Sequence, residues 1–466
     1  MQAEKVGLKS AIFLVLASMI GTGVFGVSGF LQAELLDPRL IFLCWIFGGL
    51  IALSGALCYS EIAANYPLIG GESVYLKNLF GELPAFLTAW ISVLVGFSAP
   101  IAATSYLLGD YLLQLLVSLE MSELAQFISL QWKFLGSMLI LMLSWIHILG
   151  IRSSLIFQNF VTLLKVIIIG ILLVLGFYYA SKSGFSQLAK NIGPFKSIAV
   201  GKLGGAFLMI SFAFSGWNSA IYLGSEIKDA KKNIPKALFW GTSCTILLYL
   251  LIQVLIYSYL DAAAIAGETA ILPIIVGKIF KGSAILDSVL NLGLILILLS
   301  SISVNILLGS RVCYAMGQNF KAFSFLSLKS QRFDTPIFAV LLQAGIAILY
   351  LVTGTFSSII IYMGFSLALF PMLTVAGTWV LRARLDANSL VYRSPLFPLL
   401  PIFFIGSTFL ITTVNLFQNP KESLISLLVL IIGGLVFSLI QMNKGIPASK
   451  SSLNVVDDTK PGSLGP

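Results

Sequence analysis

Lys165 is the only lysine or arginine near the middle of an apolar segment long enough to cross a bilayer. It lies about eleven residues into the segment 154–180. At about 1.5 Å per residue this is about 17 Å deep, near the midplane of a roughly 30 Å hydrocarbon core. A cation there costs about 2.5–3.5 kcal/mol on insertion scales, and such charges usually mark ion or substrate pathways. Lys165 is therefore a candidate coupling residue, and a structural lysine paired with backbone carbonyls is the alternative.

Two glycine-containing interruptions lie near the middle of two other apolar segments. The first is IGTGVF at 20–25, and the second is SGWN at 215–218. They fall in the first and sixth apolar segments, which would cross the membrane in opposite directions. Broken helices at matching positions of two halves are the best sequence sign of a transporter site at the midplane. Close helix packing at small residues is the alternative interpretation.

An unwound helix offers both kinds of backbone polar group to a ligand. Lipid cannot satisfy these groups, so they must face a cavity or a bound molecule. The free N–H groups and positive dipole end of an outer half-helix suit a carboxylate. The carbonyl groups of Ile20, Phe212, Ala213 and Ser215 suit an ammonium. A ligand that carries both groups a short distance apart is an α-amino acid.

Aromatic and amide side chains flank the two interruptions. Phe25, Phe212, Phe214 and Trp217 could act as gates that cover a substrate, or they could simply fill space. Asn218 could hydrogen-bond the ligand or tie the sixth segment to a neighbour.

The composition predicts a polytopic membrane protein. Of the 466 residues, 58% are hydrophobic and 10% are charged, whereas soluble proteins carry about 25% charge. The net charge of +9 therefore does not predict a nucleic-acid partner. The four cysteines lie in apolar segments without a CxxC pair, and a single His147 is too few for a histidine metal site. We expect no disulfide framework, no metal, no cofactor and no membrane-embedded enzyme centre.

Twelve apolar segments are long enough to span the bilayer. They run near 8–31, 39–64, 82–116, 133–151, 154–180, 203–226, 237–260, 284–313, 336–354, 357–382, 396–418 and 422–442. One set of loops carries twice as many Lys and Arg residues as the other, which predicts that both termini are cytoplasmic. We expect a cytoplasmic N-terminus at 1–7 and a disordered cytoplasmic tail at 443–466.

Further motifs lie in, or overlap, the connections between these segments. They are YPLIGGESVYL at 66–76, GIRSSLIFQN at 150–159, EIKDAKKNIPKA at 226–237 and SRVCYAM at 310–316. Glu61, Glu226 and Asp229 could form salt bridges that close an inner gate, or they could be solvated. Together with IGTGVF and FAFSGWN, these motifs resemble, in this order, the amino acid–polyamine–organocation superfamily of permeases. The chain is most similar to bacterial relatives of the L-type neutral amino-acid transporters.

The resemblance implies an all-α leucine-transporter fold over residues 8–442. It consists of two inverted five-helix repeats, at about 8–180 and 203–382, with broken helices 1 and 6 and two accessory helices at 396–442. It implies that the backbone at Gly21, Thr22 and Gly23 binds a carboxylate, and that the carbonyl groups named above bind the amine. Phe212 would occlude the substrate. Lys165 would replace a structural sodium ion, next to the broken first helix and the hydroxyl groups of Ser300, Ser301 or Ser303.

These observations predict a sodium-independent transporter of L-amino acids that works by alternating access. No acidic or arginine residue lies at either interruption, so we expect neutral substrates. Proton symport through Lys165 is the favoured coupling, and amino-acid exchange is the alternative. Transport of cationic amino acids or polyamines is an alternative substrate class. A transporter-like nutrient sensor is a weaker alternative function. The loop between segments 3 and 4 has no cysteine for a disulfide-linked heavy chain. We expect a bacterial inner membrane and assign His147 a packing or helix-end role.

Overall fold

The computed structural model describes residues 5–182, 185–191, 200–268, 271–279, 284–354, 356–385 and 389–443. Helices, joined by turns and loops, make up most of these ranges. Two isolated β-bridges, Val6 with Ile227 and Ile69 with Leu223, are the only extended pairings among the described residues. The predicted tail at 443–466 lies outside the described residues except for Asn443.

A described helix overlaps each of the twelve predicted apolar segments in whole or in part. In the first half they are α1 (Leu8–Met19), α2 (Thr22–Leu35), α3 (Pro38–Asn65), α5 (Glu82–Ile91), η1 (Ser92–Phe97), α6 (Ser98–Ser118), α7 (Ser122–Ile148) and α8 (Ile151–Lys182). In the second half they are α10 (Val200–Ala213), α11 (Ala230–Tyr259), α14 (Ala284–Asn319), α15 (Ile337–Thr353), α16 (Phe356–Arg384), α17 (Leu399–Gln418) and α18 (Pro420–Asn443).

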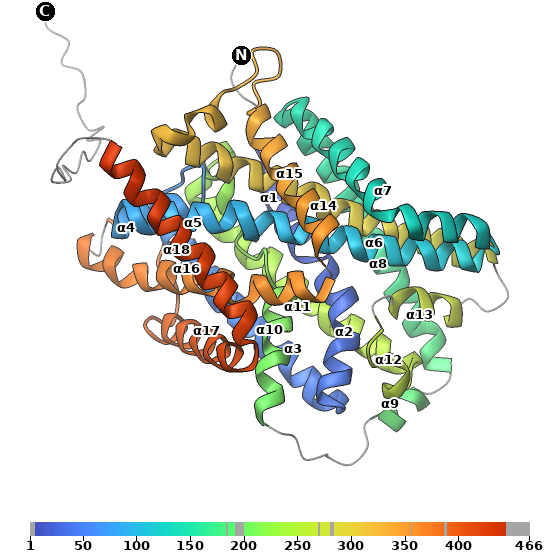
Figure 1. Cartoon of the computed structure of the whole chain (residues 1–466). Helices are drawn as coiled ribbons and strands as arrows, with labels where there is room; N and C mark the ends of the chain where they lie inside the picture. Colours follow the sequence, from blue (N-terminus) through green and yellow to red (C-terminus); the bar gives the residue numbers. More distant parts are fainter. Residues whose placement is uncertain are drawn as a thin grey trace, which may run out of the picture.

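Shorter helices connect these long ones. They are α4 (Glu72–Phe80), α9 (Ser186–Asn191), α12 (Ala262–Ile265), α13 (Ile271–Ile279), and the 3-10 turns η2 (Ser219–Tyr222), η3 (Gly224–Glu226) and η4 (Lys321–Ser327). In Figure 1, α9, α12 and α13 gather at one end of the molecule, and α4 lies beside α5 and α16 near the opposite end.

Within the described residues, nine helical stretches are long and apolar enough to cross a membrane. Two shorter apolar helices, Lys202–Ala213 and Ile337–Thr353, coincide with the sixth and ninth predicted segments. The protein is therefore a polytopic membrane protein, and the count of twelve crossings stays a prediction.

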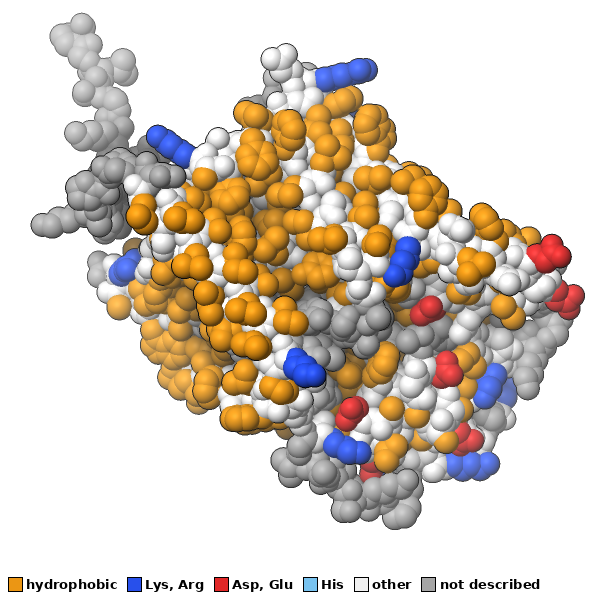
Figure 2. Space-filling view, in the orientation of Figure 1, with side chains coloured by type: hydrophobic (Ala, Val, Ile, Leu, Met, Phe, Trp, Pro, Cys, Tyr) orange, Lys and Arg blue, Asp and Glu red, His pale blue; other side chains and the backbone are white. Residues whose placement is uncertain are grey.

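The outer surface is strongly apolar. Large hydrophobic side chains on α7, α8, α17 and α18 are more than half exposed, among them Trp145, Phe160, Phe409 and Leu435. Figure 2 shows a broad hydrophobic area, with the acidic side chains of this face gathered toward the right and bottom. An exposed apolar surface of this extent needs a lipid or protein partner. Helices that cross a membrane account for it, because their outer side chains contact lipid.

In the centre of the helix bundle, α1 packs against both α11 and α8. Helix α3 packs along α11, and α6 packs along α14. These contacts place the interruption between α1 and α2 beside the end of α10. The sixth segment differs from a helix broken in its middle: α10 ends at Ala213, and residues 214–226 form turns and 3-10 helix. Gly216 has φ +91, a left-handed conformation that stops the helix, and the bonds that follow join residues three apart.

Candidate functional site

The two glycine interruptions meet inside the protein. A side-chain carbon at Gly216 would lie 2.4 Å from Ser18 Oγ, and one at Gly23 would lie 2.3 Å from Ala213 Cα. Both distances are too short for any side chain, so glycine is required for this close approach. The hydroxyl group of Tyr249 on α11 bonds the carbonyl oxygens of Met19 and Ala213, and thereby ties the two interruptions together.

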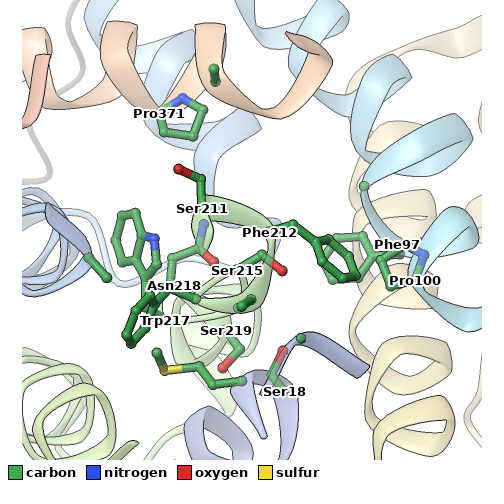
Figure 3. Close-up of a pocket in the computed structure, with 18 of the residues that line it drawn as sticks. Ser18, Phe97, Pro100, Ser211, Phe212, Ser215, Trp217, Asn218, Ser219 and Pro371 are labelled. Atoms are coloured by element: carbon green, nitrogen blue, oxygen red, sulfur yellow. The ribbon is translucent and has the colours of Figure 1, made fainter. Parts of the chain in front are cut away.

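A cavity of about 180 Å³ lies where these segments meet. Gly21 and Gly23 of the first interruption line it, together with residues 212–219 of the second. Figure 3 shows Ser211, Ser215, Trp217 and Asn218 around it, with the ring of Phe212 toward Phe97. The opposite walls come from η1, α6, α16 and α17.

Helix irregularities border the cavity on its other sides as well. Ser92, Gly96 and Phe97 belong to the π-helical turn η1, and Pro100 follows at the start of α6. Pro371 lies inside α16, where that helix lines the cavity. Proline lacks the N–H group that would bond the carbonyl four residues earlier, and π-helical turns recur at functional sites. The cavity wall therefore offers backbone polar groups that ordinary helices would bond internally.

The predicted substrate residues divide into two groups. Seven of them line the cavity: Gly21, Gly23, Phe212, Ala213, Ser215, Trp217 and Asn218. Ile20 does not, and its carbonyl oxygen accepts bonds from Lys165 and Ser301. Thr22 begins α2, but its side chain lies outside the described atoms.

The predicted gating aromatics also differ from one another. Phe212 and Phe214 line the cavity, whereas Phe25 is buried away from it. Phe214 packs against Trp45 and Tyr249, with ring centroids 5.7 and 5.1 Å away. Phe212 has no such ring partner among the described residues, and its ring points toward Phe97 (Figure 3).

Lys165 is fully buried, and its ammonium group faces three oxygen acceptors. Nζ donates to the carbonyl of Ala17 at 3.1 Å, to that of Ile20 at 2.6 Å and to Ser301 Oγ at 2.9 Å. An ammonium has three donors, so every N–H group has a partner. The carbonyl groups that it binds are those freed at the end of α1.

The other two serines predicted beside Lys165 contact different side chains. Ser300 accepts a bond from Gln158 Nε2 at 3.3 Å, and Ser303 Oγ lies 2.9 Å from His147 Nε2. His147 is buried, so the predicted packing role fits its position. Only Ser301 joins Lys165 to the first interruption, where it also donates to the Ile20 carbonyl at 2.8 Å.

Glu72 is a cavity residue that the sequence did not reveal. It stands at the start of α4, in the connection between two spans, yet it is 5% exposed and lines the cavity. Its Oε1 accepts bonds from Tyr59 at 2.9 Å and Asn218 at 2.6 Å. Burial raises the pKa of Glu72 from 4.5 to about 7. The sequence has no acidic residue at either interruption, but chain folding brings Glu72 to the cavity from a distant motif.

Two of the three predicted inner-gate carboxylates form ion pairs. Arg382 binds Glu61 with two bonds of 2.6 and 2.8 Å, and Arg311 lies 3.7 Å from Glu226. Among the residues described, Asp229 forms none. The backbone of Val6 pairs with residues 226 and 228, so the start of the described chain lies against the segment that follows η3.

Comparison with known proteins shows the family of this chain. Residues 6–437 match the family model described as amino acid permease. The chain is 27% identical over 431 residues to the serine/threonine exchanger SteT of Bacillus subtilis (strain 168), covering 91% of this chain and 94% of that protein. It is 27% identical to the mouse large neutral amino acids transporter small subunit 2 and 25% identical to the mouse Asc-type amino acid transporter 1. Each alignment covers 94% of this chain and 81% of the relative. The match over nearly the whole chain shows that this protein belongs to the amino acid permease family and is a transporter, not an enzyme.

Proposed function

We propose that this protein is a sodium-independent secondary transporter of small neutral L-amino acids that works by alternating access. Its twelve helical segments would form the two inverted repeats and two accessory helices of the leucine-transporter arrangement. It would lie in a bacterial inner membrane with both termini in the cytoplasm.

One observation carries the proposal: a single cavity is lined by both helix interruptions. The start of α2 presents helix N–H groups beside Gly21 and Gly23, which suit the carboxylate of an amino acid. The end of α10 presents carbonyl groups, which suit its ammonium. The volume of about 180 Å³ lies below the roughly 300–1,000 Å³ of pockets for drug-sized ligands, which favours a small substrate. The relatives are named for serine and threonine, for large neutral amino acids and for Asc-type amino acids.

The surroundings of Lys165 support sodium independence. Its ammonium already occupies three oxygen acceptors at the first interruption, leaving these oxygens unavailable to a metal cation. The same contacts favour a permanently charged lysine over the proton carrier expected from the sequence, because a neutral amine donates only two hydrogen bonds. A fixed charge is compatible with exchange, the activity in the name of the Bacillus relative.

Cationic amino acids are a second candidate class of substrate. The observation in their favour is Glu72, whose carboxyl group lines the cavity and makes no ion pair with a described lysine or arginine. A substrate with a positive side chain could supply the missing cation.

Uptake into proteoliposomes tests the proposal. Purified protein would be reconstituted without sodium, with an empty or amino-acid-loaded lumen, and offered radiolabelled serine, alanine, leucine, lysine or ornithine. We expect uptake of the small neutral substrates, stimulated by internal amino acid. Gly23→Ala should abolish it because the new carbon would lie 2.3 Å from Ala213 Cα. Gly170→Ala is the control, because no atom lies within 4 Å of the added carbon.

Each other outcome has a defined meaning. Uptake confined to lysine and ornithine would replace the neutral class with the cationic one. Absolute dependence on sodium would refute the role assigned to Lys165, and equal activity of the two glycine variants would refute the position of the site.

A further inference from the structure

Glu72 is placed against the cavity by the turn that precedes it. Gly70 and Gly71 have φ values of +108 and +56, a left-handed region that favours glycine. Side-chain carbons at these positions would lie 2.6 Å from Ala315 Cβ and 2.6 Å from the Tyr222 ring. The turn therefore brings the start of α4 directly onto the segment that follows α10.

The carboxyl group of Glu72 connects three elements of the site. Tyr59 from α3 and Asn218 from the second interruption both donate to Oε1. Asn218 Nδ2 also lies 3.4 Å from the hydroxyl oxygen of Tyr222, and the ring of Tyr59 packs on Trp217 at 4.7 Å. Oε2 accepts no bond from the residues that the structure describes. A change at this carboxyl group would therefore act directly on Asn218 and, through Tyr59, on Trp217, and both of these residues line the cavity.

No described positive group compensates a negative charge at Glu72. The titratable side chains that face it are Tyr59, Tyr75 and Tyr222. From α16, Thr374 lies beside Tyr59, while Arg382 binds Glu61 and Arg384 binds carbonyl groups at the end of α4. On α4 itself Lys77 bonds Asn319, and Glu82 of α5 bonds Gln441.

We propose that Glu72 is a proton-binding site of the transporter, and that its protonation stabilises the closed contact between α4, α3 and the segment after α10. Loss of the proton leaves a buried, unpaired carboxylate, which is costly, so the ionised form favours a conformation in which water reaches Glu72. The proton forms an O–H bond at the free Oε2 and returns to water when the contact opens. This inference rests on the proposed transport function, and it assigns to Glu72 the proton role that the sequence suggested for Lys165.

The pKa of Glu72, raised to about 7 by burial, fits this role. A site with such a pKa is half protonated near neutral pH, where small pH differences change its occupancy most. Two accepted hydrogen bonds and the helix N-terminus oppose the rise, but desolvation is the largest effect.

Infrared titration of the reconstituted protein tests the site without requiring transport. The absorption of protonated carboxyl groups would be followed between about pH 5 and pH 9. Solvent-exposed carboxyl groups ionise near pH 4, so we expect one band to titrate near pH 7. It should be absent in Glu72→Gln and retained, with a shifted midpoint, in Glu72→Asp. Glu123→Gln is the control, because Glu123 stands in the first turn of α7 but is exposed.

Uptake measured in the same variants tests the coupling. A single group with a pKa of about 7 is about 90% protonated at pH 6 and about 10% at pH 8, so wild-type uptake should change by up to about tenfold between them. Glu72→Gln should vary less than about twofold over this range, and Glu123→Gln should follow the wild type.

The outcomes separate this inference from the proposed function. A neutral-range band that persists in Glu72→Gln, or an uptake profile unchanged by that substitution, would overturn the proton site while leaving amino-acid transport intact. Loss of uptake of cationic amino acids alone would make Glu72 a substrate contact instead, and would also overturn it. If the wild type transported no amino acid, the proposed function would fail, and the infrared titration would still decide whether Glu72 binds a proton.

Discussion

Lys165 and Glu72 are both buried ionisable side chains beside the helix interruptions, yet their surroundings differ. Lys165 has three donors and three oxygen acceptors, and it does not line the cavity. Glu72 accepts two bonds at one oxygen, has no described cation beside it and lines the cavity. A buried charge whose hydrogen bonds are complete is held in one state, whereas one with an open oxygen and access to a cavity can exchange a proton. We therefore expect Lys165 to fix the structure and Glu72 to respond to pH.

Lys165→Ala should have the largest effect. It would remove the lysine donor from the buried Ala17 carbonyl, at roughly 1–3 kcal/mol for an unsatisfied group, and would leave Ser301 as the donor to the Ile20 carbonyl. We expect a lowered thermal unfolding midpoint and loss of uptake at every pH. Lys133→Ala is the matched control, because Lys133 also donates to a backbone carbonyl, at 2.7 Å, but at an exposed position. A stable Lys165→Ala variant that only lost its pH response would reverse the roles of the two residues.

Glu72→Gln should change the dependence of stability on pH. The pKa of Glu72 is about 7 in the folded protein and near 4.5 in the unfolded chain, so the folded state binds the proton more tightly. Its contribution is complete below about pH 4.5 and is lost as the pH rises through about 7. The total loss is about 3 kcal/mol, taking 1.36 kcal/mol for each pH unit.

Thermal unfolding in detergent, measured over this pH range, checks the prediction. From about pH 4.5 to about pH 7, the unfolding midpoint of the wild type should fall steadily relative to that of Glu72→Gln. Above about pH 7 the difference between the two midpoints should stay constant. Parallel curves for the two proteins would show that Glu72 has an ordinary pKa.

This contrast also explains what the sequence could predict. Lys165 stands out because the residues around it in sequence are apolar, and Gly21, Gly23 and Gly216 stand out because glycine is costly inside helices. Both signals are local. Glu72 lies in a polar connection, where a glutamate is an ordinary residue. Its hydrogen-bond partner Asn218 is 146 residues away in the sequence. Its position depends on a left-handed turn and a tertiary contact, which neither hydropathy nor charge pattern contains.

The same reasoning applies to residues that the motifs implied. Of three neighbouring serines, only Ser301 reaches Lys165, because Ser300 contacts Gln158 at another position of α8 and Ser303 contacts His147 of α7. The carbonyl of Ile20 was expected to bind substrate, and in the structure Lys165 and Ser301 donate to it. Sequence could predict that the first interruption carries free carbonyl groups. Which donor fills each carbonyl depends on helix rotation, which the sequence pattern does not determine.

Ser301→Ala should have an intermediate effect that sharpens the assignment of Lys165. It removes one acceptor of the ammonium and one donor to Ile20, and a hydrogen bond to a charged group contributes about 1.5–3 kcal/mol. We expect uptake to fall by a similar factor at all pH values, with no change in the pH midpoint. Ser300→Ala, one residue away and without contact to Lys165, should stay close to wild type. A shifted pH midpoint in Ser301→Ala would indicate that Lys165 itself titrates.

Tyr59→Phe should have the smallest effect. It tests whether the hydrogen bonds of Glu72 set its proton affinity. The hydroxyl group of Tyr59 donates to Glu72 Oε1 and therefore stabilises the ionised carboxylate. Its removal should raise the pKa of Glu72 further, by up to about one unit for a bond contributing about 1 kcal/mol. The infrared midpoint and the midpoint of uptake against pH should both move upward by this amount.

Tyr75→Phe provides the matched control for this last substitution. Tyr75 lies on α4 close to Glu72, but its buried hydroxyl group has no hydrogen-bond partner among the described residues. Removing that hydroxyl should leave the Glu72 midpoint almost unchanged. Equal shifts in the two variants would mean that general packing around α4, and not the Tyr59 hydrogen bond, sets the proton affinity of Glu72. A downward shift in Tyr59→Phe would mean that the tyrosine stabilises the protonated acid, and that the proton lies on Oε1 between the two side chains.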